Sequence, residues 1–315
     1  MTGRQLGWIF GVLALLLAGW LILRGRAPAD DRADGLDLGA LVGTDVAYVH
    51  IEAPGREPIE LERRTDGWTV NGYPALDSLV DATLSRLDTL PPGRLIARNP
   101  ASHERMDLTE EFAVRVRVGP AGRPDADFLV GGAGIDGRFV RLPDADAAYV
   151  LPRVVMDPLV APERSWRDFT IVRVDTAALR RVVIRRGEGV AAELIRRVGE
   201  ASGWTVGTAD GTAADGAAAD TAVMRVYLEA LADLQASGFP ADSFVYAADF
   251  ENPLALVELY TGEDGLRGPD TALLFSTGLD HPDVLVRRAD EPIVYTLDRP
   301  TANLLTSSAE RLRGR

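Results

Sequence analysis

The chain has 315 residues, a net charge of −13, and hydrophobic and charged fractions of 46% and 26%. These values are typical of a globular protein rather than a disordered chain, and the length suffices for about two domains. The acidic balance argues against a nucleic-acid partner, because phosphate binding requires a basic surface. The absence of Cys excludes disulfides, thiolate catalysis and Cys-ligated zinc.

The first predicted element is an apolar segment at the N-terminus. Residues Leu6–Leu23 carry no charged side chain, and a helix of this length spans about 27 Å, close to the thickness of bilayer hydrocarbon. Trp8 and Trp20 lie near its two ends, where indole rings favour the membrane interface. The sequence therefore predicts a single-pass anchor at residues 1–26 in the inner membrane, with a cleaved signal peptide as the alternative. We expect the bulk of the chain to lie in the periplasm.

The remaining residues are predicted to form two similar units. Residues 27–44 are expected to be a polar juxtamembrane linker, and residues 309–315 a polar tail. Between them we expect a first α+β repeat unit at 45–160, a connecting segment with a bridging strand at 161–178, and a second α+β repeat unit at 179–308.

The prediction of a duplication begins with the tetrapeptide GWTV, which occurs at Gly67–Val70 and again at Gly203–Val206. Upstream, Val46–Arg64 matches Leu179–Arg197 at a constant offset of 133 residues. Downstream, the offset rises to 144 and then 146, as loop insertions require. Similarity that keeps its order in this way indicates an internal duplication. The alternative is two unrelated α+β units that share common strand patterns.

Each unit is predicted to be a largely antiparallel sheet with one main amphipathic helix. The first unit opens with a hairpin and the GWTV strand, and Trp68 is expected to plug one face of the sheet. A helix follows from Asp77 to Leu90, with Asp77 as its N-cap and Pro91 as its stop. The helix of the second unit begins near Asp220. Strands complete each unit.

Several patterns that could carry chemistry favour a structural interpretation. The G-x-G-x-x-G run at Gly132–Gly137 precedes a predicted strand instead of the helix that a dinucleotide loop requires, so we predict a turn. No His has a second His three or four residues away, which argues against zinc. The sequence thus predicts no catalytic, cofactor-binding or metal-binding residue and no cofactor. The residues weighed and set aside are His50, His103, His281, the acid pairs Asp125/Asp127 and Asp144/Asp146 (expected in solvated turns), and the arginine pairs Arg63-Arg64 and Arg196-Arg197 (expected to serve surface solubility).

The anchor, the hairpin with its ELxRR strand, GWTV and the capped helix together resemble the bacterial family described as domain of unknown function 4340. The segments MDLTEEFAVRV (Met106–Val116) and ADFENPLALVEL (Ala248–Leu259), each entering a strand, carry the same resemblance. It implies a membrane-anchored accessory protein found beside ABC-type transport components, including those related to gliding motility. No catalytic residues are implied.

We therefore expect a non-enzymatic, extracytoplasmic accessory or interaction protein whose partners are the membrane and subunits of an ABC-type transporter. One alternative is a module that binds a cell-envelope polymer or small ligand in the crevice between the units. Solvent-facing Trp or Tyr side chains would favour that alternative, whereas a buried Trp68 and Trp204 would not. Another is a hydrolase with dispersed residues, which a cleft holding a carboxylate or His pair within hydrogen-bond reach would favour.

Overall fold

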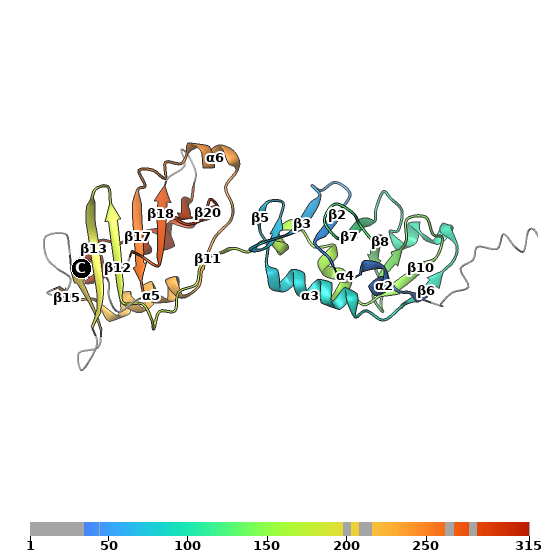
Figure 1. The fold of residues 1–315 in the computed structure, drawn as a ribbon, viewed down its shortest axis with the longest axis horizontal. Helices are drawn as coiled ribbons and strands as arrows, with labels where there is room; N and C mark the ends of the chain where they lie inside the picture. The colour runs from blue at the N-terminus through green and yellow to red at the C-terminus, as the bar shows by residue number, and fades with distance from the viewer. Residues whose placement is uncertain are drawn as a thin grey trace, which may run out of the picture. The chain divides into compact units, whose positions relative to one another are not determined.

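The computed structural model describes residues 35–43, 45–197, 203–207, 216–261, 268–276 and 282–314. The chain divides into two compact units between Arg167 and Asp168 (Figure 1). Each unit combines a large antiparallel sheet with a few helices, so the fold belongs to the α+β class. The predicted anchor at Leu6–Leu23 lies outside the described residues. Within them, no helix has both the length and the apolar character needed to cross a membrane.

The first unit is built on a sheet that has ten strands within the described residues, in the order β1-β6-β10-β9-β8-β7-β2-β3-β4-β5. Every neighbouring pair in this sheet is antiparallel. The strands are β1 (Gly35–Leu36), β2 (Tyr48–Glu52), β3 (Ile59–Arg64), β4 (Gly67–Val70), β5 (Tyr73–Pro74), β6 (Gly93–Ala97), β7 (Val114–Gly119), β8 (Ala126–Ala133), β9 (Arg138–Arg141) and β10 (Ala148–Leu151). The helices are α2 (Leu38–Val42), α3 (Asp77–Asp88) and α4 (Arg153–Leu159), with 3₁₀ turns at Pro100–Ser102, Glu104–Met106 and Glu163–Trp166.

The core of the first unit lies between one face of this sheet and α3. Alternate residues of the strands point to the same face, and the apolar ones, such as Val49, Leu61 and Phe128, are buried there. The helix contributes Val80 and Leu87 to the same cluster. The opposite face of β8 carries a smaller apolar cluster around Leu108 and Leu129, in which Leu108 follows the second 3₁₀ turn. On β2, β3 and β7 the outer face carries polar and charged side chains.

The second unit is built on a sheet that has eight strands within the described residues, in the order β15-β14-β13-β12-β17-β18-β19-β20. A separate short ladder joins β11 to β16. The strands are β11 (Thr170–Val172), β12 (Arg181–Arg186), β13 (Gly189–Arg197), β14 (Gly203–Gly207), β15 (Ala217–Ala218), β16 (Leu234–Gln235), β17 (Ala255–Tyr260), β18 (Thr271–Ser276), β19 (Val284–Arg288) and β20 (Val294–Leu297). The helices are α5 (Thr221–Ala232), α6 (Asp242–Ala247), α7 (Arg299–Leu305) and α8 (Ala309–Leu312). Met224, Tyr227 and Leu231 of α5 are buried against the sheet.

The predicted strands around both GWTV segments are present, but two predictions about the helices were wrong. Leu76, not Asp77, is the N-cap of α3, and the Asp77 carboxylate accepts a hydrogen bond from the Trp68 backbone N–H at 2.7 Å. Leu234, assigned to the apolar stripe of the second helix, instead lies in β16, because the helix ends at Ala232. The insertion Gly207–Thr221 was expected to be a loop throughout, yet Ala217–Ala218 pair with β14 as β15.

The segments expected to be polar contribute to the two cores. Within the predicted linker 27–44, Leu36 and Leu38 are buried in the first core, because β1 and α2 bring these apolar side chains against α3 and the sheet. Within the predicted tail, Leu312 of α8 is fully buried in the second core. The Arg313 guanidinium donates to the Val206 carbonyl at 2.8 Å, which fixes this end of the chain to β14. A few apolar side chains in each of these segments are buried, although the segment as a whole has a polar composition.

Candidate functional site

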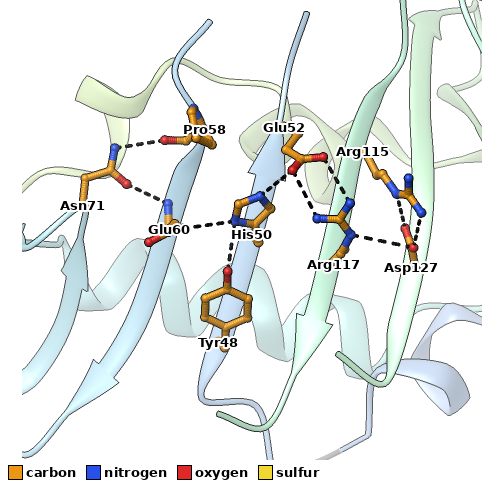
Figure 2. Close-up of polar contacts among 9 residues, drawn as sticks. All are labelled: Tyr48, His50, Glu52, Pro58, Glu60, Asn71, Arg115, Arg117 and Asp127. Carbon is orange, nitrogen blue, oxygen red and sulfur yellow. Dashed lines mark hydrogen bonds and ion pairs between the residues drawn. The ribbon is translucent and has the colours of Figure 1, made fainter. Parts of the chain in front are cut away.

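A connected group of titratable side chains lies on the outer face of the first sheet (Figure 2). The strands β8, β7, β2 and β3 are adjacent, and their register places Asp127, Arg117, His50 and Glu60 in one row across them. Side chains at alternate positions of a strand share a face, so Tyr48, Glu52 and Arg115 lie on the same face, two residues along their strands from this row. We call these seven residues the outer-face network.

His50 is at the centre of the outer-face network and is largely buried. Its Nδ1 atom lies 3.0 Å from the Tyr48 hydroxyl and 3.6 Å from a Glu60 carboxylate oxygen. Its Nε2 atom lies 2.9 Å from Glu52 Oε1. A neutral imidazole satisfies the hydrogen bonds to Tyr48 and Glu52 when its Nε2–H donates to Glu52 and the tyrosine hydroxyl donates to Nδ1. This tautomer is assigned from these two contacts.

The arginines of β7 complete the network. Arg115 binds both carboxylate oxygens of Asp127, at 2.9 and 2.6 Å, and this bond raises the pKa of the Arg115 guanidinium. Arg117 reaches both oxygens of Glu52 at 3.2 Å, and its Nε lies 3.8 Å from Asp127. The hydrogen bond from His50, and then that from Arg117, holds the pKa of Glu52 below its usual value. Both arginines therefore hold acidic partners from neighbouring strands.

The loop side chain of Asn71 anchors the neighbouring strand at the edge of this face. Its Oδ1 accepts from the Glu60 backbone N–H at 2.7 Å, and its Nδ2 donates to the Pro58 carbonyl at 3.1 Å (Figure 2). Asn71 and Gly72 both have positive φ, which is the conformation that a two-residue Asn-Gly hairpin turn requires. This turn joins β4 to β5 and fixes the position of Glu60.

A cavity of about 570 Å³ opens beside the outer-face network. Tyr48, Glu60 and Arg117 line it together with Glu62 and Arg64 of β3 and the turn around Gly122. Carboxylates and guanidinium groups both border the cavity, and Glu62 and Arg64 form an ion pair with each other. The cavity thus offers charges of both signs to an occupant.

The combination of Tyr48, His50 and Glu52 places a hydroxyl, an imidazole and a carboxylate in sequence, as nucleophilic catalysis requires. The pKa of Tyr48 is nevertheless raised, by burial and by the charges of Glu60 and Glu62. A raised pKa keeps the hydroxyl protonated and makes it a weaker nucleophile at neutral pH, whereas activation requires the opposite shift. Tyr48, His50 and Glu52 all belong to β2, and of the three only Tyr48 lines the cavity. The geometry therefore fits hydrogen bonds along one strand better than an activated nucleophile.

The other residues weighed in the sequence are dispersed. His103 is buried, with Nε2 2.9 Å from the Asp146 carbonyl, and His281 lies outside the described residues. The G-x-G-x-x-G run begins at Gly132 inside β8, and its later residues form the predicted turn, in which the Gly134 N–H donates to the Gly137 carbonyl before β9 begins. In the described part of the chain, no three His, Asp or Glu side chains are grouped so that they could hold a metal ion.

One prediction from the sequence was wrong. Asp127 was expected in a solvated turn, but it lies in β8 and pairs with Arg115. The arginine pairs were expected at the surface, where Arg63, Arg64 and Arg197 are exposed, and one member of each pair lies near a tryptophan. The Arg63 guanidinium lies 5.7 Å from the centre of the Trp68 ring, and that of Arg196 lies 6.0 Å from the centre of the Trp204 ring. The alternating charges in VRVRV and YVHIE were the signal in the sequence for the outer-face network.

Comparison with known proteins identifies the family. The model of the domain of unknown function DUF4340 matches residues 68–253, which is more than half of the chain, so the chain belongs to this family. The matched region begins at Trp68 in the first unit and ends in the second, so it includes parts of both. Neither the curated proteins nor the solved structures include a match.

Proposed function

We propose that the protein is a non-enzymatic, membrane-anchored accessory protein whose two units arose by duplication and present interaction surfaces outside the cytoplasm. The observation that carries this proposal is the equivalence of the two sheets. The run β10-β9-β8-β7-β2-β3-β4-β5 in the first has the counterpart β20-β19-β18-β17-β12-β13-β14-β15 in the second. Repetition of a whole sheet favours a structural platform over a single reactive centre.

The helices support the duplication. The bounds of α3 and α5 are 144 residues apart at both ends, and those of α4 and α7 are 146 apart at both ends. These are the offsets that the sequence comparison gives for the same regions. Such agreement in element length is expected of two copies of one unit.

Equivalent hydrogen bonds support it further. The residue two positions before each main helix donates its N–H to a tryptophan carbonyl at 2.9 Å, Ala75 to Trp68 and Ala219 to Trp204. The next residue in each unit donates to the segment that follows the last strand, Leu76 to Trp166 and Asp220 to Leu312. Bonds of this kind depend on backbone position rather than on residue identity, so they persist when sequences diverge.

An ion pair with exchanged signs occupies equivalent positions in the two sheets. In the first unit Glu52 of β2 pairs with Arg117 of β7. In the second unit Arg185 of β12 pairs with Glu258 of β17 at 2.9 Å. The register of Val49 with Val118 and of Val182 with Leu259 makes these positions correspond. Opposite charges at such neighbouring positions stabilise a sheet whichever strand carries which sign.

The membrane location rests on the apolar segment Leu6–Leu23, and the association with an ABC-type transport system rests on the family resemblance. The non-enzymatic part of the proposal is supported by the positions of His50 and Glu52, neither of which lines the cavity beside the outer-face network. The alternative of a polymer-binding module receives less support from the first unit, because Trp68 is only 4% exposed and its indole N–H donates to Asp81 at 3.0 Å. In the second unit Trp204 is half-buried.

A capture experiment tests the proposal. The full-length chain carrying a C-terminal tag is cross-linked in native membranes, purified, and its partners are identified by mass spectrometry. We expect an ABC-type transporter subunit, and we expect its loss when Leu15, Leu16 and Leu17 are each replaced by Arg, because charges in the segment oppose membrane insertion. Recovery of no transporter subunit with the intact segment would contradict the proposal.

A further inference from the structure

The first unit has a second cavity. The cavity beside the outer-face network lies at the Tyr48 end of β2, and this one lies at the Ile51 end. It has a volume of about 280 Å³ and is bordered by the β2–β3 turn and by the residues that follow α4. Its walls are mainly aliphatic and include Ile51, Ile59, Val114 and Leu159. Its charged lining residues are Arg56, Arg164, Glu57 and Glu163, and the Glu163 carboxylate pairs with Arg167 at 2.5 Å. We call this cavity the hairpin pocket.

The hairpin pocket exists because the β2–β3 ladder ends early. The last pair in that ladder is Ile51 with Ile59, and the turn between them contains Pro54 and Pro58, which have no N–H to continue the pairing. In the second unit the corresponding ladder continues to Arg186 with Gly189. The two hairpins have equal length in the sequence comparison. They differ in how far the two strands of each hairpin are paired toward the turn.

An arginine connects the hairpin to the same place in both units. Arg56 Nη1 donates to the Val160 carbonyl at 3.3 Å, and Arg186 Nη2 donates to the Thr306 carbonyl at 2.6 Å. Val160 and Thr306 are the residues that follow α4 and α7. In the first unit this contact lies beside the pocket, and the other N–H groups of Arg56 bind no described residue.

We propose that the hairpin pocket binds the aliphatic chain of an anionic amphiphile, with the head group beside Arg56. The walls named above are aliphatic and carry no aromatic ring, so they suit a flexible hydrocarbon chain. The guanidinium offers several N–H donors to a carboxylate or phosphate. This inference goes beyond the proposed accessory function and does not rest on it. A free fatty acid and a phospholipid acyl chain share the chemistry.

The absence of Cys from the chain makes a thiol probe specific. The variant Ala53→Cys places one thiol in the pocket wall of the full-length chain held in lipid nanodiscs. Its reaction with alkyl methanethiosulfonates from methyl to hexyl is followed by mass spectrometry. We expect the rate to rise severalfold over this series, because each methylene added to the reagent gains burial. The matched control Ser85→Cys, on the exposed side of α3, should show no comparable rise.

Competition by added lipids identifies the source of the aliphatic group that the pocket binds. Protection of the A53C thiol by octanoate but not by dihexanoyl phosphatidylglycerol indicates a free fatty acid, whereas protection by both indicates a phospholipid acyl chain. The same rates for all chain lengths at both thiols, with no protection, would overturn the proposal. Adding Ala161→Phe to A53C narrows the pocket and should abolish the dependence on chain length.

A second variant keeps the test decisive if the narrowed pocket disturbs folding. In A53C with Arg56→Gln the aliphatic walls are unchanged, so the dependence on chain length should remain, while protection by octanoate should require at least tenfold higher concentration. Equal protection with and without Arg56 would contradict the assignment of the head-group site.

Discussion

At the residue scale, two aspartates of α3 fasten the helix to the GWTV strand. Asp77 accepts from the Trp68 backbone N–H, and Asp81 accepts from the Trp68 indole N–H. The backbone N–H and the indole N–H of Trp68 therefore both have acceptors while its ring is buried in the core. Buried N–H groups need such partners. The second unit has Thr221 in place of Asp77 and places its carboxylate one residue earlier, at Asp220.

The variant Asp77→Ala should lower the free energy of unfolding by about 1–2 kcal/mol, because the Trp68 N–H loses its acceptor. Urea unfolding of the full-length chain followed by tryptophan fluorescence measures the change. Ser78→Ala is the matched control, since Ser78 is exposed on the same turn of the helix and should change stability little. Equal effects of the two substitutions would show that the bond to Trp68 contributes nothing.

The ion pairs of Glu52 make a pH-dependent contribution. Its pKa in the folded protein lies below its unfolded value of about 4.3, so the contribution is complete above that pH and is lost as the pH falls through the folded pKa. We expect Glu52→Gln to reduce the urea midpoint at pH 7, and the difference from the natural protein to shrink by pH 3. Glu57→Gln, whose carboxylate forms no ion pair with the described residues, should show no such pattern.

At the element scale, the two main helices begin in different ways. The N-cap of α5 is Asp220, whose carboxylate accepts from the N–H groups of Ala222 and Val223 at 2.9 Å. The N-cap of α3 is Leu76, which has no side-chain acceptor. The first helix therefore depends on its contacts with the sheet at its beginning, and the second has a cap of its own.

Removing that cap with Asp220→Ala should lower the free energy of unfolding of the second unit by about 1 kcal/mol. Amide hydrogen exchange of the first turn of α5 should accelerate with it. Asp220→Asn is the control, because asparagine caps a helix nearly as well as aspartate. Faster exchange in the asparagine variant to the same extent would mean that charge, rather than capping, is responsible.

The segments that cover the outer face of each sheet are fixed by equivalent arginines. Arg141 is buried and donates through Nε to the Leu108 carbonyl at 2.8 Å. Arg287, 146 residues later, lies with its guanidinium 4.8 Å from the centre of the Phe250 ring. Leu108 and Phe250 come from the two matching segments MDLTEEF and ADFENPL. The resemblance noticed in the sequence therefore marks a packing contact.

At the scale of the whole molecule, each unit has its own apolar core. Leu87 and Leu231 occupy equivalent positions of α3 and α5, and both are fully buried. Leu87→Ala and Leu231→Ala should each cost about 2–5 kcal/mol, because the deleted groups leave a cavity. Hydrogen exchange followed by mass spectrometry should show the first change within residues 45–160 and the second within 179–308. A change spread equally over both ranges would contradict separate cores.

The sequence by itself determined the α+β class, the main strands of both units, the two amphipathic helices and the turn at Gly132–Gly137. These depend on local periodicity and turn residues, which are visible over a few positions. The predictions of a polar linker and a polar tail were wrong at Leu36 and Leu312, which are buried. Composition describes a segment on average, whereas burial is decided by single side chains.

Only the tertiary structure decided which charges meet. Arg115 and Asp127 are twelve residues apart and Glu52 and Arg117 are sixty-five apart, so no local pattern pairs them. Their contact follows from strand order and register, which long-range pairing sets. The same holds for the hairpin pocket, whose walls come from Ile51, Val114 and Leu159. Sequence periodicity could place each of these residues on a face, but only the folded sheet brings those faces together.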